Sequence, residues 1–141
     1  MTPRQIALVR EGFALIAPNA EAVGLAIYTK IFELDPSLRG LFAEDIGPQV
    51  KRFMAAVTMV VRSLDDLTPL LANLRVLGRK HVAYGVQAKD FDTGGIALLA
   101  TLEAGLGDAF TEEARAAWTA AYTALVGAMM AGMDEVAPIA A

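Results

Sequence analysis

The chain has 141 residues, 55% of them hydrophobic, so we predict a single domain over residues 1–141 that fills its core without disulfides or a structural metal. Its formal net charge is −4 and Lys and Arg never form a cluster of four, which argues against nucleic acid and anionic membranes as partners. The absence of cysteine excludes thiolate-ligated haem, iron–sulfur clusters and cysteine nucleophiles, and it fits a reducing, cytoplasmic location.

Capping residues and prolines mark where helices begin and end. The clearest signal is at the N-terminus, where Thr2 and Gln5 form a capping-box pattern around Pro3. In chain order, the first predicted helix runs from Pro3 to Ile16, the second is capped by Asn19 and runs to Glu33, and the third begins at Pro48. The fourth starts at Thr68-Pro69 and carries His81. The fifth is capped by Asp92 or Thr93 and runs to about Leu106, and the last is capped by Thr111. Turns and loops are expected at residues 35–42, 43–47, 64–67 and 85–90.

No segment alternates apolar and polar residues with a period of two, so we predict no strands and an all-α fold. The segment Ala116–Met133 contains no charge, which is a reason to test it as a membrane span. It is rich in Ala, and its bulky residues recur on one helical face. We therefore interpret it as a core helix.

His81 is the only histidine, so a transition metal or an iron cofactor bound through nitrogen would need it as the ligand. Leu77, Leu74 and Leu70 precede it at helical spacing, so the ring projects from an apolar stripe. Gly78 is expected to leave a bare spot beside the ring. The alternative is a core histidine that makes hydrogen bonds and binds no metal.

Several residues then follow one another in a characteristic order. Tyr28, Phe42 and Gln49 come first, the stretch Leu77-Gly78-Arg79-Lys80-His81 with Tyr84-Gly85-Val86 comes next, and Trp118 and Tyr122 complete the set. Over nearly the whole chain this order resembles a bacterial single-domain globin, similar to the haem domain of flavohaemoglobins and to neuroglobin-like bacterial haemoglobins. The resemblance implies a globin fold, with six to eight helices in a three-over-three sandwich around haem b.

By this resemblance, His81 is the proximal iron ligand, and its Nδ1–H would donate to the carbonyl of Leu77. Tyr28 and Gln49 resemble the distal tyrosine–glutamine pair that hydrogen-bonds to a diatomic ligand. Taken singly, the two also fit a core tyrosine and a surface amide. The other expected haem contacts are Phe42 flat on the porphyrin, Phe53 beside the ligand, Arg52, Lys80 and Tyr84 at the propionates, and Val86 and Phe91.

Two departures from the flavohaemoglobin pattern bear on the chemistry. Flavohaemoglobins hold the proximal histidine through a tyrosine ten residues later and a glutamate on the final helix. Here those positions are Phe91 and Met133, and the nearest acid is Glu135, so peroxidase-like O–O activation is disfavoured. No flavin or nicotinamide domain follows the globin-like region, so reduction of ferric haem is expected to need a separate reductase.

The expected function is reversible binding of O2 for storage or delivery, extending to NO, CO or sulfide. Two alternatives stay open: an NO dioxygenase or nitrite reductase that uses the same haem, and a haemless globin-fold signalling module in which His81 is only a core residue. A ferric resting state in which Gln49 or another group coordinates the iron is also open. The Ala-rich faces of the last two helices allow a homodimer, although Ala is also simply a good helix former.

Overall fold

The structure is a computed structural model that describes residues 1–140 and the side chains of residues 1–136. All regular elements in that part of the chain are helical, which confirms the all-α prediction. The α-helices are α1 (Pro3–Ile16), α2 (Ala20–Leu34), α3 (Gly47–Arg62), α4 (Leu71–Ala83), α5 (Ala88–Leu106) and α6 (Glu112–Ala140). Four 3-10 turns connect them: η1 (Ala17–Asn19), η2 (Pro36–Leu41), η3 (Thr68–Leu70) and η4 (Gly107–Ala109).

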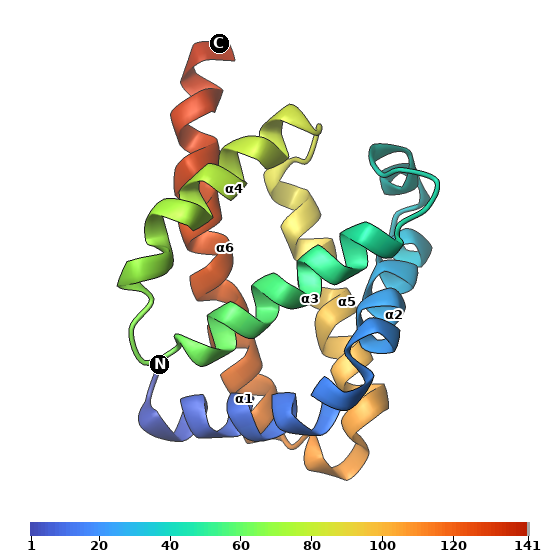
Figure 1. The fold of residues 1–141 in the computed structure, drawn as a ribbon, viewed down its shortest axis with the longest axis vertical. Helices are drawn as coiled ribbons and strands as arrows, with labels where there is room; N and C mark the ends of the chain where they lie inside the picture. Colours follow the sequence, from blue (N-terminus) through green and yellow to red (C-terminus); the bar gives the residue numbers. More distant parts are fainter. Residues whose placement is uncertain (141) are drawn as a thin grey trace.

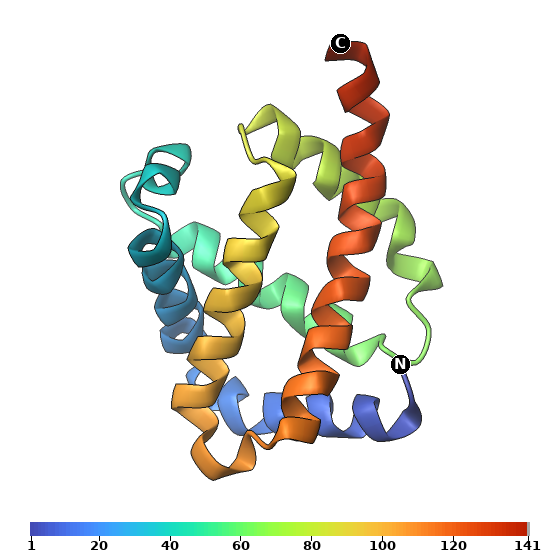
Figure 2. The ribbon, with the colours of Figure 1, turned by 180° about the vertical axis from the view of Figure 1, so that it is seen from behind.

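The helices form two layers. In Figure 1, α3 and α4 lie in front of α5 and α6, and in the opposite view α5 and α6 are in front (Figure 2). Helix α4 packs mainly against α6, α2 packs against α3 and α5, and α1 packs against α6, whereas α3 and α4 make no comparable contact with each other. The main core lies between the layers and includes Val9, Ile27, Val61, Leu102 and Trp118. This arrangement leaves α3 and α4 as separate walls on one face of the molecule.

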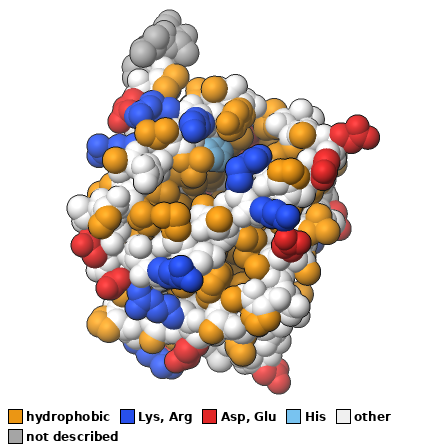
Figure 3. Space-filling view, in the orientation of Figure 1, with side chains coloured by type: hydrophobic (Ala, Val, Ile, Leu, Met, Phe, Trp, Pro, Cys, Tyr) orange, Lys and Arg blue, Asp and Glu red, His pale blue; other side chains and the backbone are white. Residues whose placement is uncertain are grey.

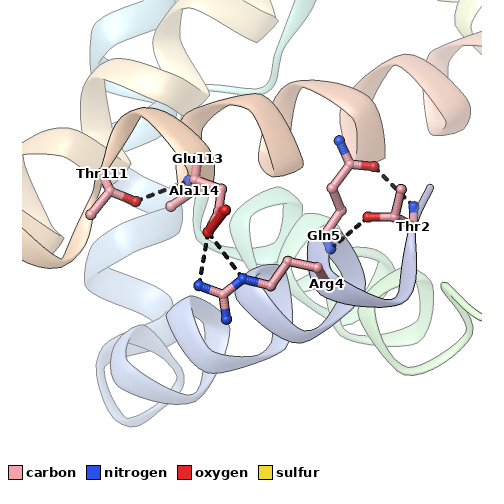
Figure 4. Close-up of polar contacts among 6 residues, drawn as sticks. All are labelled: Thr2, Arg4, Gln5, Thr111, Glu113 and Ala114. Atoms are coloured by element: carbon pink, nitrogen blue, oxygen red, sulfur yellow. Dashed lines mark hydrogen bonds and ion pairs between the residues drawn. The ribbon is translucent and has the colours of Figure 1, made fainter.

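The first and last helices begin where the sequence predicts. The side chain of Thr2 accepts a hydrogen bond from the Gln5 amide at 3.1 Å, and the Gln5 side chain accepts one from the Thr2 amide at 3.0 Å (Figure 4). The side chain of Thr111 caps α6. In the first turn of each helix, Arg4 Nη2 donates to Glu113 Oε1 at 2.8 Å, which links the two helix starts.

The predicted start of α5 is wrong. We expected a loop as far as residue 90 and a cap at Asp92 or Thr93, but the helix begins at Ala88. The reason is a reciprocal cap, in which the Gln87 amide donates to Asp90 Oδ2 at 2.8 Å and the Gln87 side chain accepts from the Asp90 amide. The earlier start adds a helical turn and places Phe91 inside the helix.

Helix α4 begins at Leu71 instead of at the predicted Thr68-Pro69, because residues 68–70 form the 3-10 turn η3, and the ends of α2 and α3 differ from the prediction by one residue. Helix α2 starts directly after Asn19 as expected, but the Asn19 side chain makes no capping hydrogen bond. Helix α2 ends at Leu34 and α3 begins at Gly47. Differences of this size are normal at helix ends.

Helices α4 and α6 cross at two glycines. A Cβ atom on Gly78 would overlap the backbone oxygen of Met129, and one on Gly132 would overlap the backbone oxygen of Arg75. The two backbones therefore meet directly, at a distance that no side chain allows. The expectation that Gly78 leaves a bare spot beside His81 is wrong, because this face of α4 meets α6.

Tyr122 joins α6 to the beginning of α5. Cβ atoms on Gly94 and Gly95 would lie 2.8 Å from its oxygen and 3.0 Å from its ring, so the glycines make room for it. Its O–H donates to the Phe91 carbonyl at 2.6 Å. Burial raises the pKa of Tyr122 far above its ordinary value of 10.0, and the nearby charge of Asp92 acts in the same direction.

Helix α6 is long and apolar enough to span a membrane by length and composition alone. Its buried residues include Trp118 in the main core and Met133 in a second cluster, and the helix packs against α1, α4 and α5. This packing is that of a core helix.

Gly78→Ala should destabilise the protein by about 2–3 kcal/mol, because the added methyl group forces two backbones apart and overpacking of this kind is costly. Urea unfolding measures the change. The matched control is Gly127→Ala on α6, where a Cβ meets nothing within 4 Å. Removing that glycine should stabilise the protein by up to about 1 kcal/mol, and equal effects of the two substitutions would contradict the close crossing.

The free energy of unfolding should fall as the pH rises above about 10. The unfolded state loses the Tyr122 proton near the ordinary pKa of 10.0, whereas the folded state keeps it because its pKa is raised. Tyr122→Phe should make this alkaline loss shallower, and at neutral pH it should cost about 0.5–1.5 kcal/mol by removing the hydrogen bond to the Phe91 carbonyl. Urea unfolding between about pH 8 and 11 tests both effects. Tyr84→Phe, at a side chain that is 62% exposed, is the control and should change neither quantity.

Candidate functional site

His81 lies in the last turn of α4 and is half-buried. Its Nδ1 is 2.6 Å from the carbonyl oxygen of Leu77, one turn back in the same helix, so the predicted hydrogen bond is present. Because a carbonyl only accepts, Nδ1 carries the proton and Nε2 keeps its lone pair. Among the residues whose side chains are described, none hydrogen-bonds to Nε2. One ring nitrogen is thus engaged by the backbone, and the other has no hydrogen-bond partner among the described side chains.

Apolar and aromatic side chains surround this imidazole. The Phe91 ring lies 5.7 Å from the His81 ring, centroid to centroid, and Tyr84 lies 6.5 Å away. Phe91 is buried, and together with Leu77 and Val86 it belongs to the second hydrophobic cluster, between α4, α5 and α6. The hydrogen bond from Tyr122 to its backbone helps to hold Phe91 in place.

The acidic groups near this helix do not reach His81. Met133 is buried in the cluster that contains Phe91. Glu135 forms an ion pair with Arg79 on the neighbouring face of α4. Within residues 1–136, no carboxylate hydrogen-bonds to His81, which agrees with the missing tyrosine–glutamate chain in the sequence.

Tyr28 and Gln49 are brought together from different helices. Tyr28 on α2 is only 6% exposed, and Gln49 is in the first turn of α3. Gln49 Nε2 donates to the Tyr28 oxygen at 3.1 Å. The Tyr28 ring meets Phe42 edge-on at 5.4 Å and Phe53 at 5.5 Å, so the phenol stands in an aromatic cluster.

The phenol of Tyr28 remains protonated at neutral pH. Burial raises its pKa, while the hydrogen bond from Gln49 and the charge of Arg52 oppose that shift. A protonated phenol keeps an O–H to donate. Within the described side chains, that O–H has no acceptor among the hydrogen bonds of the structure.

The basic residues predicted at the propionates lie in different surroundings. Arg52 Nη2 donates to Gln49 Oε1 at 3.0 Å, a contact that the sequence analysis missed. The spacing of Gln49 and Arg52 could have predicted this contact, because residues three apart on a helix are neighbours. Lys80 is exposed, as is Tyr84, and both follow the helix turn that carries Leu77.

A cavity of about 290 Å³ lies between α3 and α4, next to the candidate site, and its lining does not include His81, Tyr28 or Gln49. Ala56, Met59 and Val60 line it from α3, and residues of α4 that include Leu74, Leu77 and Lys80 line it from the other side. Figure 3 shows this face: the single histidine lies among hydrophobic side chains, with Lys and Arg side chains around them. The opening between α3 and α4 is therefore apolar inside and basic at its edge.

These residues fit a haem group. In the described part of the chain, no three His, Cys, Asp or Glu side chains gather to hold a bare metal ion. A single imidazole is a weak site by itself, but a porphyrin brings four nitrogen ligands and needs only one axial ligand from the protein. Nε2 of His81, in an apolar surrounding, is suited to that role.

Comparison with known families and curated proteins agrees with this interpretation. The globin family model matches residues 25–129. The neuroglobin of Danio rerio is 34% identical over 139 residues, covering 89% of this chain and 87% of the relative. The neuroglobin of Dissostichus mawsoni is 33% identical with the same coverage.

Solved structures show the same fold. An engineered carbene transferase from Rhodothermus marinus, described as a putative nitric oxide dioxygenase, has a TM-score of 0.88 and 25% identity, covering 99% of this chain and 97% of that chain. A bacterial globin from Campylobacter jejuni has a TM-score of 0.87 at 20% identity, covering 97% of this chain and 99% of that one, and shows the fold alone. The two helical layers are thus the three-over-three globin sandwich, and the chain belongs to the globin family of haem proteins.

Proposed function

We propose that this protein is a haem b globin that reversibly binds O2, with His81 as the proximal ligand and Tyr28 with Gln49 as the distal pair. One observation carries the proposal. The available nitrogen of His81 stands on α4, and a hydrogen-bonded phenol and amide stand on α2 and α3, with the apolar opening between α3 and α4. Family membership and the neuroglobin relatives support it.

Haem supplies a ferrous iron that binds diatomic gases reversibly, and the protein decides how the haem is held. The hydrogen bond from Nδ1 to the Leu77 carbonyl fixes the ring orientation of His81 and, in the neutral imidazole, leaves the lone pair on Nε2. The Phe91 and Val86 side chains keep the surroundings of the imidazole apolar. Phe42, Phe53, Lys80 and Tyr84 are proposed as further haem contacts, at the porphyrin face, the ligand side and the propionates.

On the distal side, Tyr28 is the principal donor to the ligand. Its oxygen already accepts from Gln49, so its own O–H is available, and its raised pKa keeps that proton in place. A hydrogen bond of this kind contributes about 1–2 kcal/mol in a dry site, and about 1.4 kcal/mol slows dissociation tenfold. We therefore expect slow release of O2.

NO dioxygenation is the second candidate, because the Rhodothermus marinus neighbour carries that description. The residues beside His81 support O2 binding more strongly. Phe91 makes no hydrogen bond to the imidazole, Met133 is apolar, and Glu135 is engaged by Arg79. A proximal histidine without a carboxylate behind it gives less push toward O–O cleavage.

The wider setting of the protein is also part of the proposal. We propose NO, CO and sulfide as further ligands, a cytoplasmic location, and a separate reductase that returns ferric haem to the ferrous state. The lack of cysteine supports the location. A homodimer through the last two helices stays a prediction, for which sedimentation is the direct measurement.

His81→Gly should remove most of the haem affinity, and imidazole added to the solution should restore it by occupying the space of the lost ring. Haem reconstitution followed by the Soret band and the ferrous spectrum measures both steps. Ala72→Gly, an exposed position on the same helix, controls for the cost of a glycine in α4. A His81→Gly protein with a normal five-coordinate ferrous spectrum and no imidazole would exclude His81 as the ligand. Wild-type protein without a Soret band despite ample haem would favour the haemless module.

Tyr28→Phe should speed O2 dissociation roughly tenfold, because one hydrogen bond to the ligand is lost while the aromatic packing remains. Stopped-flow displacement of O2 by CO measures the rate. Thr29→Val, which removes an exposed hydroxyl from the next residue of α2, is the control and should leave the rate unchanged. A rate within about twofold of wild type in the Tyr28 variant would remove this residue from the mechanism.

A further inference from the structure

Three polar side chains form a chain that leads from the surface into the distal side of the site. Arg52 Nη2 lies 3.0 Å from Gln49 Oε1, and Gln49 Nε2 lies 3.1 Å from the Tyr28 oxygen. Arg52 is exposed, Gln49 is half-buried and Tyr28 is buried, so the chain becomes progressively drier along its length. The proposed function uses the inner two residues only.

The chemistry of these groups gives the chain one direction. A guanidinium has only donors, so Arg52 must donate and Gln49 must present its carbonyl oxygen to it. The amide nitrogen then faces Tyr28 and donates to the phenol oxygen. The remaining hydrogen of the phenol is left to point elsewhere. If the Gln49 amide were turned over, its NH2 group would face the N–H groups of the Arg52 guanidinium, and two donors facing each other is unfavourable.

Arg52 has no competing partner in the described structure. Its neighbour Lys51 forms an ion pair with Glu21 at 3.7 Å, and none of the ion pairs among residues 1–136 includes Arg52. The polar contact that the structure gives to its guanidinium is the one with Gln49. The position three residues after Gln49 on the same helix is the geometry that such a contact requires.

We propose that Arg52 is a positioning residue that sets the orientation of the Gln49 amide and so leaves the Tyr28 O–H free to donate to the bound gas. The inference rests on the proposed function and names an added determinant of ligand release. Donation along a chain of hydrogen bonds also strengthens the last donor, so Tyr28 becomes a better donor while Arg52 is in place. Without Arg52 the amide can turn over and accept the Tyr28 proton itself, which removes that proton from the ligand.

The primary test compares two variants that lose the same charge at adjacent positions of α3. Arg52→Met removes the donor to Gln49, and Lys51→Met removes a charge that does not contact Gln49. Arg52→Met should speed O2 dissociation about threefold or more, as expected for the partial loss of one hydrogen bond. Lys51→Met should leave the rate unchanged. Equal rates in the two variants would overturn the proposal.

A double-mutant cycle shows whether Arg52 acts through the amide. In a Gln49→Leu background, Arg52→Met should have no further effect on O2 dissociation, because the group that Arg52 orients is absent. An undiminished effect in that background would overturn the proposal. Arg52 could also act through the haem propionates, and reconstitution with haem dimethyl ester tests this because the ester carries no propionate charge. An effect exerted through the propionates disappears in that protein, whereas an effect exerted through Gln49 persists.

Two spectroscopic readouts do not depend on ligand release. In the ferrous CO complex, Arg52→Met should shift the C–O stretch to higher wavenumber, because a weaker donor near the gas reduces back-donation into CO. The side-chain NH2 of Gln49, followed by NMR in the same complex, should exchange faster with solvent in Arg52→Met than in Lys51→Met. An unchanged stretch and unchanged exchange would overturn the proposal. If Tyr28→Phe leaves O2 dissociation unchanged, the distal role itself fails, whereas failure of Arg52→Met alone rejects only this inference.

Discussion

The hydrogen bond between His81 Nδ1 and the Leu77 carbonyl is the interaction on which the site depends. It is made within one helix, so it needs no other part of the fold, and it decides three things together: the tautomer, the ring orientation and which nitrogen is available. The chain has no second histidine and no cysteine to replace it. The role proposed for Tyr28 and Gln49 depends on this nitrogen being available to the haem iron.

That space exists because α4 is held elsewhere. Gly78 and Gly132 let the backbones of α4 and α6 meet directly, so α4 is anchored to α6 and stays apart from α3. The second hydrophobic cluster, with Phe91 and Met133, supports the imidazole from the same side. Close packing behind the histidine and an open face in front of it are therefore two results of one helix crossing. Near that cluster, Glu135 is paired with Arg79, and the proposed preference for gas binding over O–O bond activation rests in part on this pairing.

On the distal side, the structure relates a surface charge to a buried hydroxyl. Tyr28 is kept as a phenol by burial and is surrounded by aromatic rings, while its one polar partner, Gln49, is itself oriented from the surface by Arg52. The affinity of such a site depends on where protons point as well as on which residues are present. An exposed arginine is thereby given a role that an account based on charge alone would miss.

The sequence by itself determined the helical class, the starts of α1 and α6, and the presence of one histidine, His81, whose hydrogen bond to the Leu77 carbonyl was expected. These features depend on local spacing, on capping chemistry or on the count of one residue type, and each of these can be obtained directly from the sequence. Only the tertiary structure decided that Gly78 faces α6 and that Tyr122 donates to the Phe91 backbone, whereas the pairing of Tyr28 with Gln49 was expected from the family resemblance and the structure added its hydrogen bond. Each of these contacts joins residues far apart in sequence. The start of α5 at Ala88 was missed for a local reason: the polar residues Gln87 and Asp90 were interpreted as part of a loop, whereas they form the cap of the helix. Which face of a helix meets which neighbour depends on how all six α-helices of the described chain pack together, and no local pattern records that.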